Sequence, residues 1–149
     1  MTALDQEIID HMANPKNYGT MEQADAIGIG ENPENGEKVI IYLRVNDKGD
    51  SPQIEDIRFQ AIGCMTTVVA GSIITGEAKG IDFETGKELI SVTLGMLEDV
   101  PAEEAACSEM VAVSLQAAMD TYNAKKADPD HGTITYKIEN SCEVKEDAQ

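Results

Sequence analysis

Two apolar strands joined by a turn occupy the stretch VIIYLRVNDKGDSPQIEDIRFQAIGC, residues 39–64. Apolar and polar side chains alternate on both sides of the turn at 46–52, which is the period of a strand with one buried face. The turn is too short for a crossover connection, so the sequence predicts an antiparallel hairpin. The side chains expected on its buried face are Val39, Ile41, Leu43, Val45, Ile57, Phe59 and Ala61.

Helical periodicity replaces the alternation after Gly63. A first helix is predicted from Met65 to a stop at Lys79-Gly80, and residues 83–97 predict one or two short helices broken near 91–93. A longer helix is predicted to begin near Cys107; its apolar stripe is Val111, Leu115, Ala118 and Tyr122.

Weaker signals complete the expected architecture. An amphipathic N-terminal helix is predicted from Leu4, Ile8 and Met12, and short strands are predicted at 26–29 and 133–138. Gly28 and Gly30 are interpreted as residues of a loop. Because strands come first and helices follow, we predict an α+β fold, a small antiparallel three-stranded sheet with helices packed on one face.

Composition excludes several classes of function. The chain has 149 residues and a formal net charge of −17, which repels nucleic acid and anionic membranes and favours cationic partners. Trp is absent, so stacking of bases on indole rings is not available. No apolar run approaches membrane-spanning length, and the start does not resemble a signal peptide. Three cysteines do not form a disulfide framework, so we expect a cytoplasmic protein.

Two cysteines and one acid are the candidate site residues. Cys64 and Cys107 are each expected to open a helix, where the helix dipole favours the thiolate that binds soft metals and attacks sulfur. The hairpin should bring Glu37 to the same end of the sheet as Cys64, and Cys107 joins them if its helix packs across the sheet. Such ligands suit zinc, ferrous iron or an iron–sulfur cluster. The alternative is that the cysteines are small buried hydrophobes and that Glu37 is solvated.

Several motifs resemble the IscU/NifU-type iron–sulfur cluster scaffold family. They are Ile8-Ile9-Asp10-His11, Asn14-Pro15-Lys16-Asn17-Tyr18-Gly19, Gly36-Glu37, residues 54–59, Gly63-Cys64 and Cys107-Ser108. The resemblance covers roughly residues 4–125. It implies an IscU/SufE-like fold with a scaffold domain at 1–125 and an acidic C-terminal extension, expected to be partly mobile, at 126–149.

The resemblance also implies a function. Such scaffolds are not enzymes: they build a [2Fe–2S] cluster from iron and from persulfide sulfur delivered by a cysteine desulfurase, and pass it to recipient apo-proteins. Of the family's three cysteine ligands, the second and third fall on Cys64 and Cys107, while Asn35 occupies the first position. Glu37 replaces an Asp that tunes cluster release, and Ala106 replaces a His ligand. The chaperone-docking motif is reduced to Pro101.

These departures leave alternatives open. Missing ligands could come from a partner chain in a homodimer, from an external thiol or from Cys142, which is otherwise expected to be a free thiol in a polar tail. The chain could instead be an interaction module that keeps the scaffold fold without metal, or a zinc-binding sulfur acceptor. His11 is expected to cap or pack a helix end, and His131 to be solvated in a turn.

Overall fold

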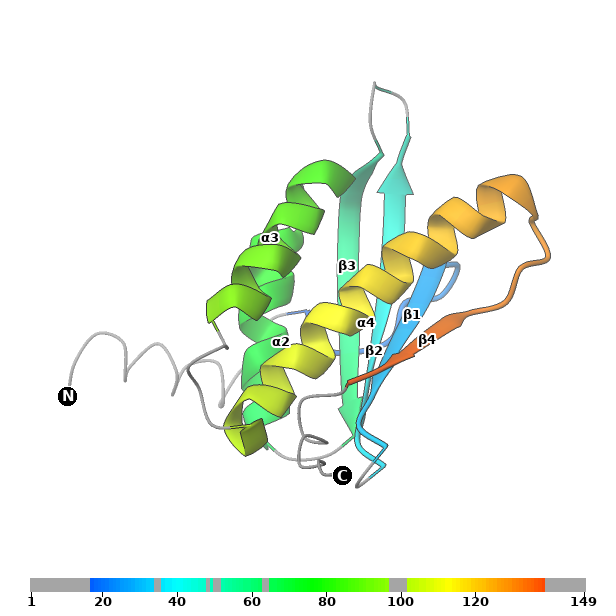
Figure 1. Cartoon of the computed structure of the whole chain (residues 1–149). Coiled ribbons are helices and arrows are strands. Elements are labelled where there is room, and N and C mark those ends of the chain that lie inside the picture. The colour runs from blue at the N-terminus through cyan, green and yellow to red at the C-terminus, as the bar shows by residue number, and fades with distance from the viewer. Residues whose placement is uncertain are drawn as a thin grey trace.

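The sheet carries its helices on one face, in an α+β arrangement (Figure 1). The computed structural model describes residues 17–33, 36–47, 49, 52–62, 65–96 and 102–138; the side chains of 65, 66, 96, 102–105 and 107 lie outside this description. The described elements are β1 (Ala26–Glu31), β2 (Lys38–Asn46), β3 (Gln53–Ile62), α2 (Met65–Ala78), α3 (Phe83–Met96), α4 (Ala102–Ala127) and β4 (Ile134–Lys137).

The sheet has four strands in the order β3-β2-β1-β4. β2 pairs antiparallel with both β1 and β3, which confirms the predicted hairpin. β4 runs parallel to β1, with Ile134 opposite Gly28 and Lys137 opposite Glu31. The prediction of a three-stranded, wholly antiparallel sheet is therefore wrong. The late strand adds a fourth member, and it is parallel because the chain returns to the sheet along α4 rather than through a hairpin.

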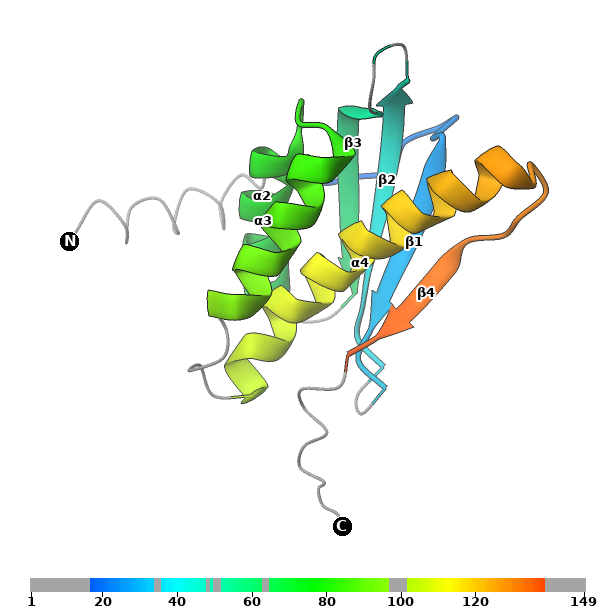
Figure 2. The same ribbon diagram turned by 45° about the horizontal axis from the view of Figure 1, so that its top comes forward.

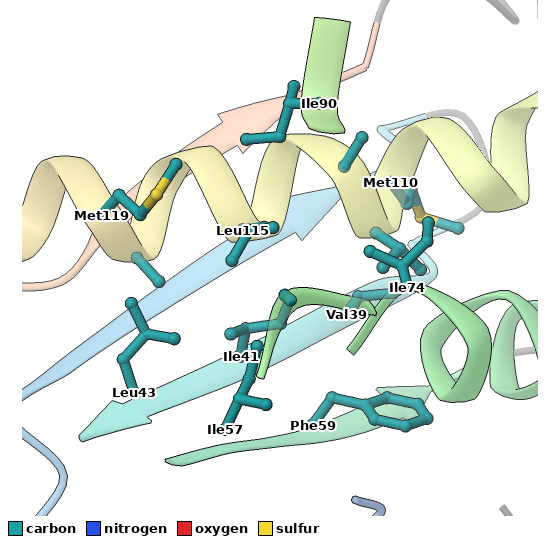
Figure 3. Packing of buried hydrophobic residues seen from close by; sticks show 14 of the residues in the cluster. Val39, Ile41, Leu43, Ile57, Phe59, Ile74, Ile90, Met110, Leu115 and Met119 are labelled. Carbon is teal, nitrogen blue, oxygen red and sulfur yellow. The ribbon is translucent and has the colours of Figure 1, made fainter. Parts of the chain in front are cut away.

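The core fills the space between the sheet and the helices (Figure 3). Val39, Ile41, Leu43, Ile57 and Phe59 are fully buried on the helix side of β2 and β3, as the alternation predicts. Helix α4 lies along β1 and contacts β2 and β4, α2 packs on β3, and α3 packs on α4. Figure 2 shows the three labelled helices on the same side of the sheet.

Two glycines let α4 approach the sheet backbone. A Cβ atom at Gly30 would lie 2.3 Å from the carbonyl oxygen of Met110, far inside the contact distance of two atoms. Gly28 meets α4 at Ala118 in the same way. Both glycines belong to β1, so their interpretation as loop residues is wrong: they are needed where two backbones touch.

The helix boundaries correct two further predictions. Helix α3 runs without a break from Phe83 to Met96, although residues 91–93 were expected to interrupt it. Helix α4 begins at Ala102, not near Cys107. The start of α2 at Met65 agrees with the prediction. Among the described helices, none combines the length with the apolar composition that crossing a bilayer requires.

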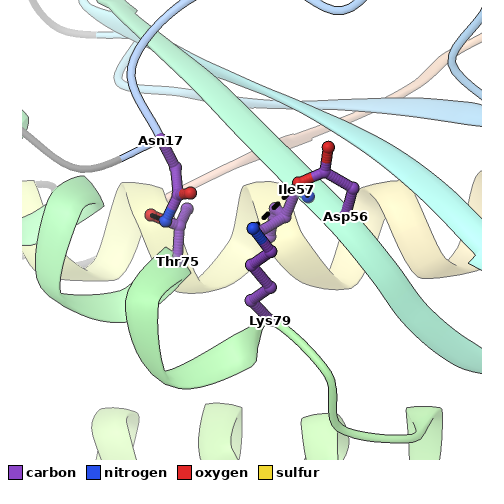
Figure 4. A network of polar contacts seen from close by, with 5 residues as sticks. All are labelled: Asn17, Asp56, Ile57, Thr75 and Lys79. Atoms are coloured by element: carbon purple, nitrogen blue, oxygen red, sulfur yellow. Dashed lines mark hydrogen bonds and ion pairs between the residues drawn. The ribbon is translucent and has the colours of Figure 1, made fainter.

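A short N-terminal segment closes the outer edge of β3. The N–H of Phe59 donates to the carbonyl of Asn17 at 2.9 Å, and the N–H of Gly19 donates to the carbonyl of Phe59 at 2.8 Å. The Asn17 amide also donates to the Thr75 hydroxyl of α2 at 3.2 Å (Figure 4).

The predicted N-terminal helix lies outside the described residues, and the predicted boundary at residue 125 between domain and extension stays a prediction.

Candidate functional site

The predicted site residues follow or precede strand ends that lie at the same end of the sheet. Strand register places Glu31 opposite Lys38, and Lys38 opposite Ile62, so β1 and β3 end where β2 begins. Glu37 immediately precedes Lys38. Cys64 lies outside the described residues, but it follows Ile62 by two positions, a reach of at most about 7 Å. The hairpin therefore ties Glu37 and Cys64 to the same end of the sheet.

Helix α4 approaches the same end. Its contacts with β1 run from Ala118 at Gly28 to Met110 at Gly30, so its N-terminal half points towards Glu31. Cys107 precedes Met110 by three residues, about 4.5 Å further along the axis in that direction. The backbone of Cys107 therefore lies at the end of the sheet that carries Glu37, as the prediction of a helix packed across the sheet requires. Figure 1 shows α4 running across the sheet.

The prediction that the helix dipole favours a thiolate at Cys107 is not supported by the bounds of α4. Because α4 begins at Ala102, Cys107 is in the second turn, and the helix dipole acts mainly within the first. Cys64, in contrast, directly precedes the first residue of α2, as predicted. The helix-dipole argument for a thiolate therefore applies to Cys64 alone.

A tight turn orders the described part of the loop before β2. The N–H of Asn32 donates to the carbonyl of Glu37 at 2.9 Å, and the N–H of Gly36 donates to the carbonyl of Asn32 at 2.8 Å. Gly36 has φ of 78°, a conformation that glycine adopts without steric cost. Asn32 is buried, whereas Glu37 is half-buried, so the Glu37 backbone is fixed while its side chain has access to the surface.

Ala106 belongs to the hydrophobic core. Only 5% of its surface is exposed, and it packs in the same cluster as Met110 and Val39. The residue that precedes Cys107 therefore supplies packing, and its methyl group cannot bind a metal.

The ligand assignment itself stays a prediction. Cys64, Asn35, Cys142 and His11 lie outside the described residues, as does the side chain of Cys107. Within the part of the chain that the structure describes, no three His, Cys, Asp or Glu side chains are grouped so as to hold a metal ion. His131 is exposed, as expected.

An apolar groove of about 380 Å³ beside α4 was not predicted from the sequence. Its walls come from α2 and α3, and Ser108 of α4 contributes to its lining. Two wall residues, Ile73 and Val92, are 39% and 59% exposed. The spacing of Met65, Val69 and Ile73 predicts that Ile73 lies on the apolar face of its helix. That expectation is wrong, because Ile74 and Ala78 are the residues of α2 that pack in the core.

Residues 3–129 match the family model of the NifU-like N-terminal domain. The chain belongs to the NifU-like N-terminal domain family. This confirms the resemblance drawn from the sequence motifs, and the family match extends over the described elements β1 to α4.

Curated relatives of this NifU-like chain carry scaffold names. It is 34% identical over 123 residues to the iron–sulfur cluster assembly scaffold protein IscU 1 of Archaeoglobus fulgidus, covering 80% of this chain and 76% of the relative. It is 27% identical over 127 residues to IscU of Escherichia coli, covering 83% of this chain and 97% of the relative.

Solved structures share the fold. A NifU-like protein (N-terminal part) from Brucella abortus aligns with a TM-score of 0.65 at 13% identity, covering 80% of this chain and 94% of that one. A putative iron–sulfur cluster assembly scaffold protein for the SUF system from Fervidobacterium islandicum aligns with a TM-score of 0.60 at 20% identity, covering 76% and 94%. These likenesses confirm the α+β fold predicted for the NifU-like chain.

Proposed function

We propose that this chain is an iron–sulfur cluster assembly scaffold whose cargo, iron or a [2Fe–2S] cluster, is held by Cys64 and Cys107 with Glu37 beside them. Two observations support the proposal: Glu37 and the turn of α4 that holds Cys107 lie at the end of the sheet where β3 stops, two residues before Cys64, and the chain's curated relatives are named as scaffolds. The chain then acts by holding and passing on its cargo, without turning over a small-molecule substrate.

The donor set accounts for part of a cluster's coordination. Two thiolates and one carboxylate supply three donors at most, whereas a [2Fe–2S] cluster needs four. Buried Ala106 adds no donor, and the neutral amide of Asn35 is a weak one. The fourth position is then filled by an external thiol, a second chain or Cys142. An incomplete shell also leaves one side of the cargo open to a recipient's cysteine, which is what transfer to an apo-protein requires.

Sulfur would reach the site as persulfide on a cysteine desulfurase. The Cys64 thiolate attacks the outer sulfur of that persulfide, a new S–S bond forms on the scaffold, and the desulfurase cysteine leaves as a thiolate. The position of Cys64 directly before α2 favours the attacking thiolate. The net charge of −17 suits docking to a cationic desulfurase surface. Binding that does not weaken with added salt would remove this electrostatic component.

Two other functions remain testable alternatives. The carboxylate and two thiolates would also bind zinc, which makes a zinc-dependent sulfur acceptor the second candidate. Ala106 and Asn35, at positions where the resemblance implies ligands, favour an interaction module that binds no metal.

Metal analysis of the anaerobically purified chain separates the three functions. Iron with acid-labile sulfide and visible charge-transfer bands supports the scaffold, and stoichiometric zinc without sulfide supports the sulfur acceptor. If neither metal binds, even after reconstitution with iron, sulfide and thiol, the chain is an interaction module.

A further inference from the structure

The apolar groove beside α4 has no role in the proposed site chemistry. Ile73 and Ile74 of α2 face Leu89 and Val92 of α3 across it. Ile73 is 39% exposed and Val92 is 59% exposed. These large apolar side chains therefore lie at the open edge of the groove and not in the core. An open channel between two helices is the shape that accepts a third helix by its apolar side.

The charges beside the groove are acidic. Glu77 is the single ionisable side chain in its described lining, and exposed Glu88 lies one turn before Val92 on α3. Among nearby cations, Lys79 is 3.5 Å from the carboxylate of Asp56 at the edge of β3 (Figure 4). Lys87 and Glu88 line a neighbouring hollow on α3 together with Val92. The described lining of the groove is thus apolar with one carboxylate, Glu77, and Glu88 lies next to it on α3.

We propose that this groove is a docking site for an amphipathic helix of another protein, one that carries apolar side chains on one face and Lys or Arg beside them. Apolar side chains would cover Ile73 and Val92, and the basic groups would lie against Glu77 and Glu88. A second copy of this chain suits the groove poorly, since two molecules of net charge −17 repel one another.

The chain's own N-terminal segment is the rival occupant. Residues 1–16 precede Asn17, whose side chain donates a hydrogen bond to Thr75 of α2, the residue after Ile74 of the groove lining. It contains three acidic residues and a single Lys, however, and those charges oppose Glu77 and Glu88.

Docking here would place the partner next to the candidate site. Ser108 lines the groove and directly follows Cys107 in α4. A helix seated between α2 and α3 would therefore contact the residue that follows the proposed cargo ligand in the sequence. The inference goes beyond the scaffold function and does not depend on bound metal, so the two can fail separately.

The test uses two synthetic amphipathic peptides, both with Leu on one face, one with Lys and one with Glu on the other. Their binding to the full-length, metal-free chain is measured by fluorescence anisotropy. The Lys peptide should bind saturably and the Glu peptide should not. Val92→Asn should weaken binding about tenfold, the loss expected when one exposed apolar anchor no longer buries its methyl groups. Glu77→Gln should weaken it at low salt and much less at high salt.

Ile62→Asn is the matched control, because Ile62 is 55% exposed at the end of β3, outside the groove lining. It should leave the dissociation constant unchanged. Thermal unfolding checks that each variant folds. Three results would overturn the proposal: no saturable binding of the Lys peptide, equal effects of Val92→Asn and Ile62→Asn, or binding that appears only after residues 1–12 are deleted. A dimer in solution that Val92→Asn dissociates would also overturn it, in favour of a second copy.

Discussion

Gly28 of β1 lies so close to Ala118 of α4 that a Cβ atom on the glycine would be 2.0 Å from the Ala118 amide nitrogen. The obstacle is helix backbone, which cannot rotate away as a side chain can. This contact sets the distance between α4 and the sheet, and with it the position of Cys107 relative to Glu37.

Gly28→Ala should therefore destabilise the fold and displace α4. We expect a loss of about 1–3 kcal/mol or more in the free energy of unfolding, the usual cost of overpacking, measured by urea denaturation. Gly76→Ala in α2 is the control, since nothing lies within 4 Å of its Cβ position. That change should stabilise the helix by about 0.5–1 kcal/mol. Equal stability of the two variants would show that α4 does not rest on β1 as described.

Sequence patterns predicted the hairpin because β2 and β3 each bury one face, and strict alternation follows from that. They missed the start of α4 because the acidic run before Cys107 resembled a loop. Pro101 followed by Ala102, Glu103 and Glu104 is in fact a favourable helix start, with the acids near the positive end of the dipole.

The rest of the fold depends on tertiary contacts. The parallel pairing of β4 follows from where α4 returns the chain to the sheet, and a strand of four residues carries no sign of its partner. The expectation that Cys64 lies near Glu37 follows from hairpin connectivity alone and stays a prediction. The position of Cys107 could not, because it depends on the close contacts of Gly28 and Gly30 with α4.

A polar cluster at the tip of the β2–β3 hairpin predicts alkaline sensitivity. The Tyr122 hydroxyl donates to the Asp47 carboxylate at 2.9 Å, and Lys126 lies 2.9 Å from the same oxygen. Burial and the Asp47 charge raise the pKa of Tyr122 to about 12. A raised pKa stabilises the fold below the unfolded value of about 10, and this contribution is lost as pH rises towards 12.

The wild-type free energy of unfolding should thus fall between about pH 10 and pH 12, and the fall should be smaller in Tyr122→Phe. Urea denaturation at a series of pH values measures it, with ultraviolet titration of the tyrosinate as a direct check. Identical alkaline profiles for the two proteins would show that Tyr122 titrates normally.

Restoring a thiol at position 35 should strengthen cargo binding. The resemblance places the family's first cysteine ligand there, and a third thiolate would fill the position that an external donor must otherwise supply. Asn35→Cys should slow loss of the visible charge-transfer bands to a chelator. Pro33→Cys, two residues away on the exposed side of the loop, is the control and should leave the rate unchanged. The same rate in all three proteins would place the site elsewhere.

Introducing a histidine at position 106 should not complete the site. Ala106 is 5% exposed within the core cluster, so a larger imidazole must displace its neighbours. We expect Ala106→His to lower the free energy of unfolding by about 1–3 kcal/mol without raising iron content. A stable variant with more bound iron would mean that the first turns of α4 open towards the site.

Iron and acid-labile sulfide per chain, measured after anaerobic reconstitution of the wild type and three single Cys→Ser variants, test the central claim most directly. We expect Cys64→Ser and Cys107→Ser each to lose both iron and sulfide, while Cys142→Ser keeps them. Wild-type iron and sulfide in both the Cys64 and the Cys107 variant would contradict the account.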